Sequence, residues 1–96
     1  MLIHIVVWKY SDDVSEDVRA EHVAALKALD GLVPGMARFE VGTDVLHLER
    51  SYDTGLASAF EDRAALDAYT DHPEHVKVAQ MGKRISAHVA SVDFFV

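Results

Sequence analysis

The stretch YTDHPEHVKVA, residues 69 to 79, places Tyr69, His72 and His75 around Pro73. A neutral imidazole can act as a general base near pH 7, and a phenol hydroxyl can donate a hydrogen bond to a carbonyl oxygen that gains negative charge. Because Pro73 suits the first turn of a helix, His75 would lie in that turn, where the positive helix potential disfavours imidazolium. The stretch therefore predicts proton abstraction beside a carbonyl, with Tyr69 and His75 as the catalytic pair.

The same stretch also has a plain structural interpretation. His72, next to Pro73, would then cap a helix or lie on the surface, and Tyr69 would be a half-buried aromatic residue with a hydrogen-bonded hydroxyl. His72 and His75 have the i, i+3 spacing of possible metal ligands, but the sequence places no third ligand beside them. We therefore expect no metal site and no cofactor.

His4 and Asp93 are further candidates, because each stands in an otherwise apolar, strand-like stretch. A buried carboxylate needs a partner, and either His4 or His75 could supply it for Asp93. Val6 and Trp8 share the parity of His4 along an extended chain, so these three would line the same cavity. The predicted binding residues are His4, Val6, Trp8, Val23, Leu26, Leu56, His72 and Asp93.

For several of these residues core packing is the simpler role. This holds for Val23, Leu26 and Leu56, although core and pocket wall are the same surface in so small a fold. We assign no role to His22 or His47.

Composition narrows the class of protein. The 96 residues, half of them apolar, suit one domain over 1–96 with its own core, and the net charge of −7 argues against a nucleic-acid or anionic-membrane partner. The absence of cysteine excludes disulfides and thiol nucleophiles. No apolar run approaches the roughly 20 residues of a membrane span, and no secretion signal is evident. We expect a cytoplasmic protein.

Periodicity and turn signals give the elements that must position these side chains. The expected strands cover residues 2–10, 36–42, 52–60 and 88–96. The expected helices run from an N-cap at Ser15 to the Pro-Gly pair at 34–35, over 61–69 with Asp62 as cap, and from Pro73 onward. Residues 43–51 are either a strand extension or an apolar loop over a partner.

This β-α-β-β-α-β order, with its second helix broken at Pro73, predicts an α+β, ferredoxin-like sandwich with a four-stranded antiparallel sheet. Helices on one face leave the other face of the sheet uncovered. Yet residues 2–10 and 88–96 are apolar on both parities, which indicates strands buried on both faces. We therefore expect a homodimer that packs sheet against sheet.

The segments HIVVWKY, VPGMARFEVG, SYDTGLASAFED, ALDAYTDHPEHVKVA and the terminal VDFFV together resemble the stress-responsive A/B barrel (Dabb) family of dimeric α+β barrel proteins. The resemblance covers nearly the whole chain, and the HP motif is its most specific part. It implies a homodimer whose sheets form a barrel. It also implies a comparison with a plant polyketide cyclase of the family, which closes a linear chain by aldol condensation without a cofactor.

By that resemblance the catalytic tyrosine and histidine fall on Tyr69 and His75, and two pocket residues fall on His4 and Asp93. The substrate-shaping residues differ, since Thr54, Leu26 and Ser86 replace a histidine and two aromatic residues. Some relatives carry a magnesium ion on backbone carbonyls, which would map to Asp30, Val33 and Met36.

The expected function is a small-molecule pocket in a Dabb-type homodimer, with polyketide cyclase-like catalysis by Tyr69 and His75. The alternative is a non-enzymatic stress-responsive or ligand-binding dimer with an apolar ligand. A cofactor-free monooxygenase is a third possibility, because one fold hosts many chemistries.

Overall fold

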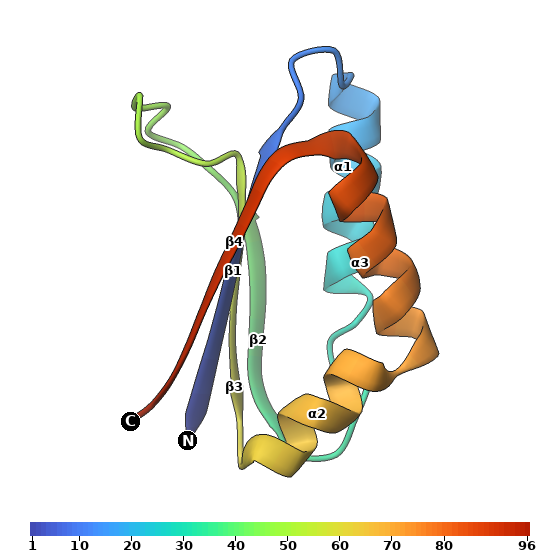
Figure 1. Cartoon of the computed structure of the whole chain (residues 1–96), viewed down its shortest axis with the longest axis vertical. Coiled ribbons are helices and arrows are strands. Elements are labelled where there is room, and N and C mark those ends of the chain that lie inside the picture. The colour runs from blue at the N-terminus through green and yellow to red at the C-terminus, as the bar shows by residue number, and fades with distance from the viewer.

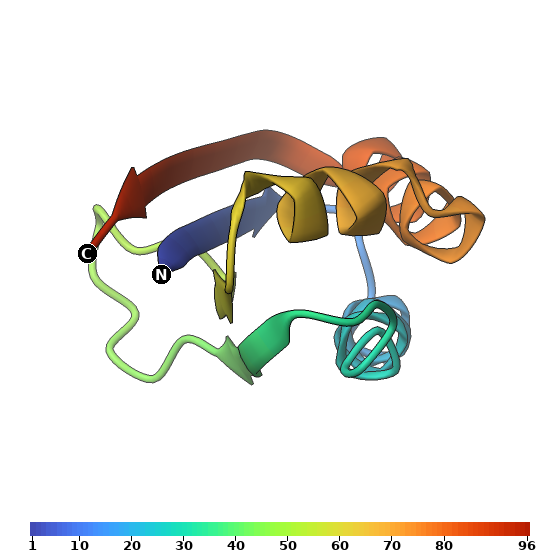
Figure 2. The same cartoon turned by 90° about the horizontal axis from the view of Figure 1, so that it is seen from below.

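A four-stranded antiparallel sheet, in the order β2-β3-β1-β4, forms one layer of the molecule, and three helices cover one of its faces (Figure 1). The structure is a computed structural model that describes all 96 residues. The elements in chain order are β1 (Leu2–Tyr10), α1 (Glu16–Lys27), β2 (Met36–Thr43), β3 (Thr54–Phe60), α2 (Arg63–Asp71), α3 (Pro73–Ile85) and β4 (Ser86–Phe95). Figure 2 shows the helices gathered on the same side of the sheet. The predicted ferredoxin-like α+β fold, including the broken second helix, is confirmed.

The predicted helix starts are also confirmed. The hydroxyl oxygen of Ser15 accepts a hydrogen bond from the Val18 N–H at 3.2 Å, and a carboxylate oxygen of Asp62 accepts one from the Ala65 N–H at 2.8 Å. Such bonds satisfy backbone donors that have no partner inside the helix. Pro73 begins α3, where its missing N–H removes no helical hydrogen bond.

The first helix is shorter than the sequence predicted. It ends at Lys27, and the chain continues to Gly35 in turns. Leu29 and Val33 are buried as the helical periodicity predicted, but the local bonds from the Leu32 N–H to the Leu29 carbonyl and from the Asp30 N–H to the Lys27 carbonyl span three residues. Consecutive tight turns can therefore keep an apolar spacing that imitates a helix.

Residues 44–53 form a loop that projects beyond the sheet on the side away from the helices (Figure 1). Of the two alternatives for residues 43–51, the strand extension is wrong, because β2 ends at Thr43. The bond from the Asp44 N–H to the Asp53 carbonyl closes the neck of the loop at 2.9 Å. Val45 and Leu46 near its tip are 82% and 67% exposed, so the loop carries apolar side chains into solvent.

The alternation of β1 divides its side chains between the two faces of the sheet. Leu2, Trp8 and Tyr10 face the helices and are buried, together with Leu56 and Phe60 of β3. This is the core, and it lies between the sheet and the helices.

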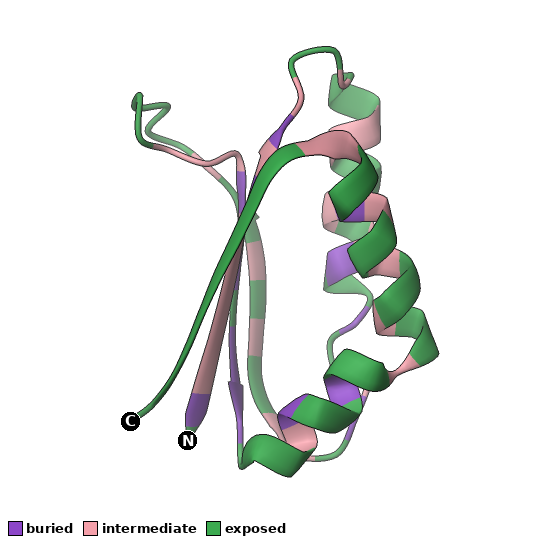
Figure 3. Ribbon diagram, in the orientation of Figure 1, coloured by how far each residue is buried: buried purple, intermediate pink, exposed green.

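The opposite face of the sheet has no covering layer. Ile3 and Ile5 of β1 stand beside Phe94 and Val92 of β4 there, and the last two are 40% and 55% exposed. Every residue of β4 after Ser86 is exposed, as Figure 3 shows. Because only 15 of 96 residues are buried, the isolated chain leaves much of its apolar surface in water. None of the helices combines the length and apolar character needed to cross a membrane.

Candidate functional site

The break between α2 and α3 lies at His72. This residue has an extended backbone, with φ −63° and ψ 133°, because a residue before proline avoids the α region. Its Nδ1 accepts a hydrogen bond from the Glu74 N–H at 3.1 Å and caps α3. His72 therefore lies at the helix start and does not line the cavity described below. The change of direction brings Tyr69, before the break, against His75, after it.

Tyr69 and His75 pack ring against ring. Their ring centroids are 4.4 Å apart and the ring planes are tilted by 47°. Tyr69 is only 1% exposed, and burial raises its pKa to about 12. The phenol therefore stays protonated at neutral pH and can donate a hydrogen bond.

The backbone fixes the protonation pattern of His75. Its Nδ1 lies 2.9 Å from the carbonyl oxygen of Thr70, and since a carbonyl only accepts, Nδ1 carries the proton. In the neutral ring Nε2 then holds the free lone pair. Burial lowers the pKa of His75, the bond to Thr70 opposes this, and the nearby His4 lowers it further. The sequence attributed a neutral ring to the helix N-terminus, whereas burial is the main cause in the structure.

Asp93 pairs with His4 rather than with His75. The two residues are direct neighbours across β1 and β4, and His4 Nδ1 lies 2.5 Å from Asp93 Oδ1. A carboxylate only accepts, so Nδ1 of His4 donates and its Nε2 is left for other contacts. The His4 ring stands edge-on to Tyr69, with the centroids 6.3 Å apart. Asp93 thus orients an imidazole beside the Tyr69–His75 pair.

These rings line an apolar cavity of about 340 Å³ between the helices and the sheet. That volume lies at the lower end of small-molecule sites. The lining residues are His4, Val6, Trp8, Leu26, Leu56, Tyr69, Thr70, His75, Val78, Ala79, Lys83, Val89 and Ser91.

Seven of the ten predicted site residues lie in this wall. Of the other three, Asp93 lines an adjoining hollow with His4 and Thr70, Val23 lines a separate cavity, and His72 caps α3. The sequence missed the later lining residues of α3. Their signal was the four-residue spacing from His75 through Ala79 to Lys83, which places them on one helix face.

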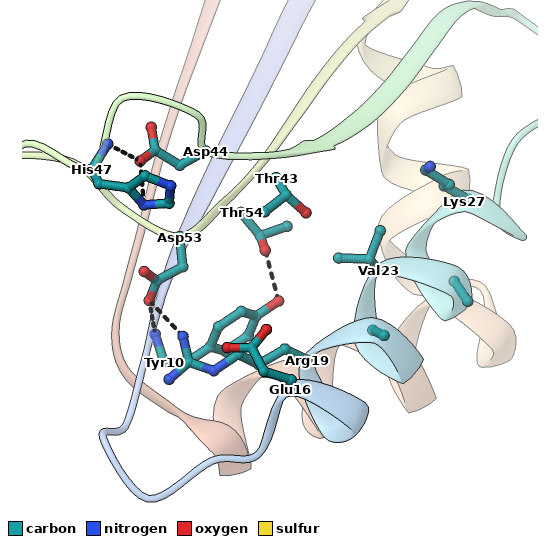
Figure 4. A pocket seen from close by; sticks show the side chains of 12 residues that line it. Tyr10, Glu16, Arg19, Val23, Lys27, Thr43, Asp44, His47, Asp53 and Thr54 are labelled. Carbon is teal, nitrogen blue, oxygen red and sulfur yellow. Dashed lines mark hydrogen bonds and ion pairs between the residues drawn. The ribbon is translucent and has the colours of Figure 1, made fainter.

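A second cavity, of about 540 Å³, is larger but is lined by neither Tyr69 nor His75. It lies between α1 and the 44–53 loop, and most of its charged groups already have partners (Figure 4). Arg19 approaches a carboxylate oxygen of Asp53 at 3.8 Å, and His47 Nδ1 approaches Asp44 at 3.6 Å. The smaller apolar cavity is therefore the better candidate, because it combines acid–base groups with an apolar wall.

His22, to which the sequence assigned no role, is fully buried. Its Nδ1 bonds to the Tyr10 hydroxyl at 2.7 Å, and that hydroxyl also bonds to Thr54 at 2.8 Å. Burial lowers the pKa of His22, and its Nε2 has no hydrogen-bond partner. The ring lies against Gly82 of α3, so its place is in the packing between α1 and α3.

Two of the three backbone positions implied for magnesium, Asp30 and Val33, lie in the turns after α1. In the turns after α1, the carbonyl oxygens of Asp30 and Val33 accept no backbone hydrogen bond, so both are available as ligands. No group of three His, Cys, Asp or Glu side chains is arranged to hold a metal. Neither Asp30 nor Val33 lines the cavity that contains Tyr69 and His75.

Residues 2–96 match the Stress Responsive A/B Barrel Domain (Dabb) family. The chain belongs to this family. A curated relative of this kind is the stress-response A/B barrel domain-containing protein HS1 of Arabidopsis thaliana. It is 31% identical over 78 residues, which are 79% of this chain and 72% of that protein.

Solved structures agree with this Dabb fold. A dimeric ferredoxin-like protein of unknown function from Thermobifida fusca superposes with a TM-score of 0.91 at 23% identity, over 99% of this chain and 90% of that one. A hydroxynitrile lyase from Passiflora edulis superposes with a TM-score of 0.86 at 17% identity, over 99% and 92% of the two chains. At these identities the likeness establishes the fold alone.

Proposed function

We propose that this Dabb protein is a cofactor-independent enzyme that uses Tyr69 and His75 to make or break a carbon–carbon bond next to a carbonyl group, as a polyketide cyclase does. The observation that carries the proposal is that the rings of Tyr69 and His75, with centroids 4.4 Å apart, lie in the wall of an apolar cavity. Nδ1 of His75 is already hydrogen-bonded to the Thr70 carbonyl. In this proposal, a basic nitrogen and a phenol donor are both available to a molecule that binds in the cavity.

The proposed reaction begins when Nε2 of His75 removes a proton from the carbon next to a substrate carbonyl. Tyr69 donates a hydrogen bond to the oxygen of the resulting enolate, whose developing charge it stabilises. The enolate carbon then attacks a second carbonyl of the same chain. The new alkoxide takes the proton from the imidazolium of His75, which restores both groups.

Burial supports both roles. It lowers the pKa of His75, so the imidazole is neutral and able to accept a proton at pH 7. It raises the pKa of Tyr69 to about 12, so the phenol remains a donor throughout. His4 is hydrogen-bonded to Asp93 and lies beside Tyr69. It can therefore contact the same substrate oxygen as Tyr69.

Turnover of linear poly-β-ketones tests the proposal. We expect His75→Ala to lower kcat/KM by about 10²- to 10⁴-fold, and Tyr69→Phe to lower it by about 10²-fold. His47→Gln is the matched control, since His47 lies in the 44–53 loop and does not line this cavity. If His75→Ala and Tyr69→Phe both keep wild-type activity, the catalytic assignment is wrong. If wild type binds such ketones without turnover, the pocket serves a ligand-binding dimer instead.

Cyanohydrin cleavage is a second assay, suggested by the fold shared with the Passiflora edulis hydroxynitrile lyase. It would need the same kind of base, which takes the hydroxyl proton as the carbon–carbon bond breaks and cyanide leaves. Release of cyanide from mandelonitrile by wild type, and its loss in His75→Ala, would favour this reaction over cyclisation.

The active form in this proposal is a homodimer in which the two uncovered sheet faces pack together. Support comes from the row formed by Ile3, Ile5, Val92 and Phe94 and from the exposure of β4. A stable interface buries about 800 Å² on each partner, and packing of large side chains contributes about 1.5–3 kcal/mol each. A cytoplasmic location also belongs to the proposal, and cell fractionation tests it.

A further inference from the structure

Lys83 brings an unpaired positive charge to a mostly apolar wall. It lines the same cavity as Tyr69 and His75, on the face of α3 that also carries Ala79. Among the ion pairs of the chain, Arg63, Arg38 and Lys77 each have a carboxylate partner, and Lys83 has none. Its long apolar stem can follow the wall while the ammonium stays hydrated at the rim.

The position of Lys83 along the helix sets a distance. His75 and Lys83 are separated by eight residues, so they lie about 12 Å apart along the axis of α3, at 1.5 Å per residue. The acid–base pair and Lys83 therefore line parts of the cavity that are two helical turns apart along α3. Val78 and Ala79 form an apolar stretch between them.

We propose that Lys83 makes the site selective for substrates that carry a free carboxylate at the end remote from the reacting carbonyl. This inference rests on the proposed function for the identity of the reacting end. The expected substrates are amphipathic keto acids with an apolar middle and an anionic end. A neutral ester or ketone of the same length would fit the cavity but would lose the contact with the ammonium.

The charge of the whole molecule does not attract an acid. The net charge of −7 repels an anion at long range, so an acid gains attraction only from a cation close to its own carboxylate. A hydrogen bond to a charged group at such a site is worth roughly tenfold in affinity.

Lys83 has one competing role, and the sequence supplies a matched control for it. Lys83 and Arg84 both stand in the last turn of α3, where cations stabilise the carbonyl end of a helix. Lys83 lines the cavity and Arg84 does not. Arg84→Met therefore removes the same charge from the same turn without touching the proposed contact.

Binding of two probes that differ only in charge tests the inference. The probes are 6-phenylhexanoate and 6-phenylhexanamide, which share size and shape, and calorimetry gives the dissociation constants. We expect wild type and Arg84→Met to prefer the carboxylate by roughly tenfold, and Lys83→Met to lose that preference. Raising the salt from 0.05 to about 1 M should weaken binding of the carboxylate alone.

Several outcomes would overturn the inference. They are equal affinities for both probes in wild type, equal loss in Lys83→Met and Arg84→Met, or no binding of either probe. Coenzyme A is a third probe. Lys83→Met could weaken binding of coenzyme A but not binding of the carboxylate. In that case the ammonium binds a phosphate group of a coenzyme A thioester, and the free-acid assignment is wrong. Because these are binding measurements, they can fail while His75→Ala still abolishes turnover, and the reverse also holds. If Lys83→Met does not fold, Lys83→Gln and the salt dependence of wild type still decide.

Discussion

Helix α3 approaches the core closely at Gly82, so Gly82→Ala tests the packing on which the cavity depends. A Cβ added there would lie 2.7 Å from Nε2 of His22 and 2.9 Å from Nε1 of Trp8. Neither ring can easily move away, because His22 is fully buried and bonded to the Tyr10 hydroxyl, and Trp8 is 6% exposed.

Two opposing terms set the expected size of the effect. Overpacking of a dense core costs about 1–3 kcal/mol, whereas alanine is favoured over glycine inside a helix by about 0.8–1.0 kcal/mol. The net destabilisation is therefore about 1 kcal/mol. For a domain of this size, such a loss lowers the melting temperature by about 4–8 °C.

Thermal unfolding followed by circular dichroism measures this change. Gln80→Ala, an exposed substitution on the same helix, is the control and should stay within about 0.5 kcal/mol of wild type. In a His22→Ala background the clash with the imidazole is gone, so Gly82→Ala should cost less there than in wild type. A higher melting temperature for Gly82→Ala alone would refute the close packing of α3 on His22 and Trp8.

Three further predictions concern the site, the pH dependence and the assembly. Asp93→Asn should lower kcat by roughly tenfold with little change in KM, because the amide no longer fixes the proton of His4 on Nδ1. Burial lowers the pKa values of both His22 and His75 below the ordinary 6.5, so the unfolded chain binds more protons than the folded one as the pH falls past that value. The free energy of unfolding, measured in urea, should therefore have its full value above pH 6.5 and decrease as the pH falls below 6.5. Ile5→Glu should convert a dimer into a monomer in light-scattering chromatography, because it places a charge on the uncovered face of the sheet.

Each of these predictions has a result that contradicts it. An unchanged kcat for Asp93→Asn would mean that the contact with His4 is only structural. A free energy of unfolding that rises on acidification would contradict the lowered pKa values. Ala68→Glu, on the exposed surface of α2, is the control for Ile5→Glu. If both variants elute as wild type does, the uncovered face is not the dimer interface.

The elements were predictable wherever local chemistry decides them. Ser15 and Asp62 begin helices because their side chains satisfy free N–H groups, and Pro73 begins one because it needs no such partner. The end of α1 was not predictable from the spacing of Leu29 and Val33. Burial requires only that these residues recur on one side of the chain, and tight turns satisfy that requirement as well as a helix does.

The candidate site divides in the same way. His4 was recognisable because it stands in an apolar strand, and Tyr69 and His75 because they stand close together around Pro73. The partner of Asp93 was not, since the choice between His4 and His75 depends on the pairing of β1 with β4, which joins residues at opposite ends of the chain. Val23 was placed in the wrong cavity, because a helix with two partly buried sides can face either one.

The sequence by itself determined the order of the elements, the break at Pro73 and the presence of a phenol and two imidazoles within seven residues around that proline. These properties depend on residues close together in the chain. The tertiary structure decided which nitrogen of His75 carries the proton, that Asp93 holds His4, and that Lys83 faces the same cavity. Those facts depend on contacts between separate elements. The positions of such contacts are set by packing of the whole core and leave no mark on the spacing of residues along one strand or helix.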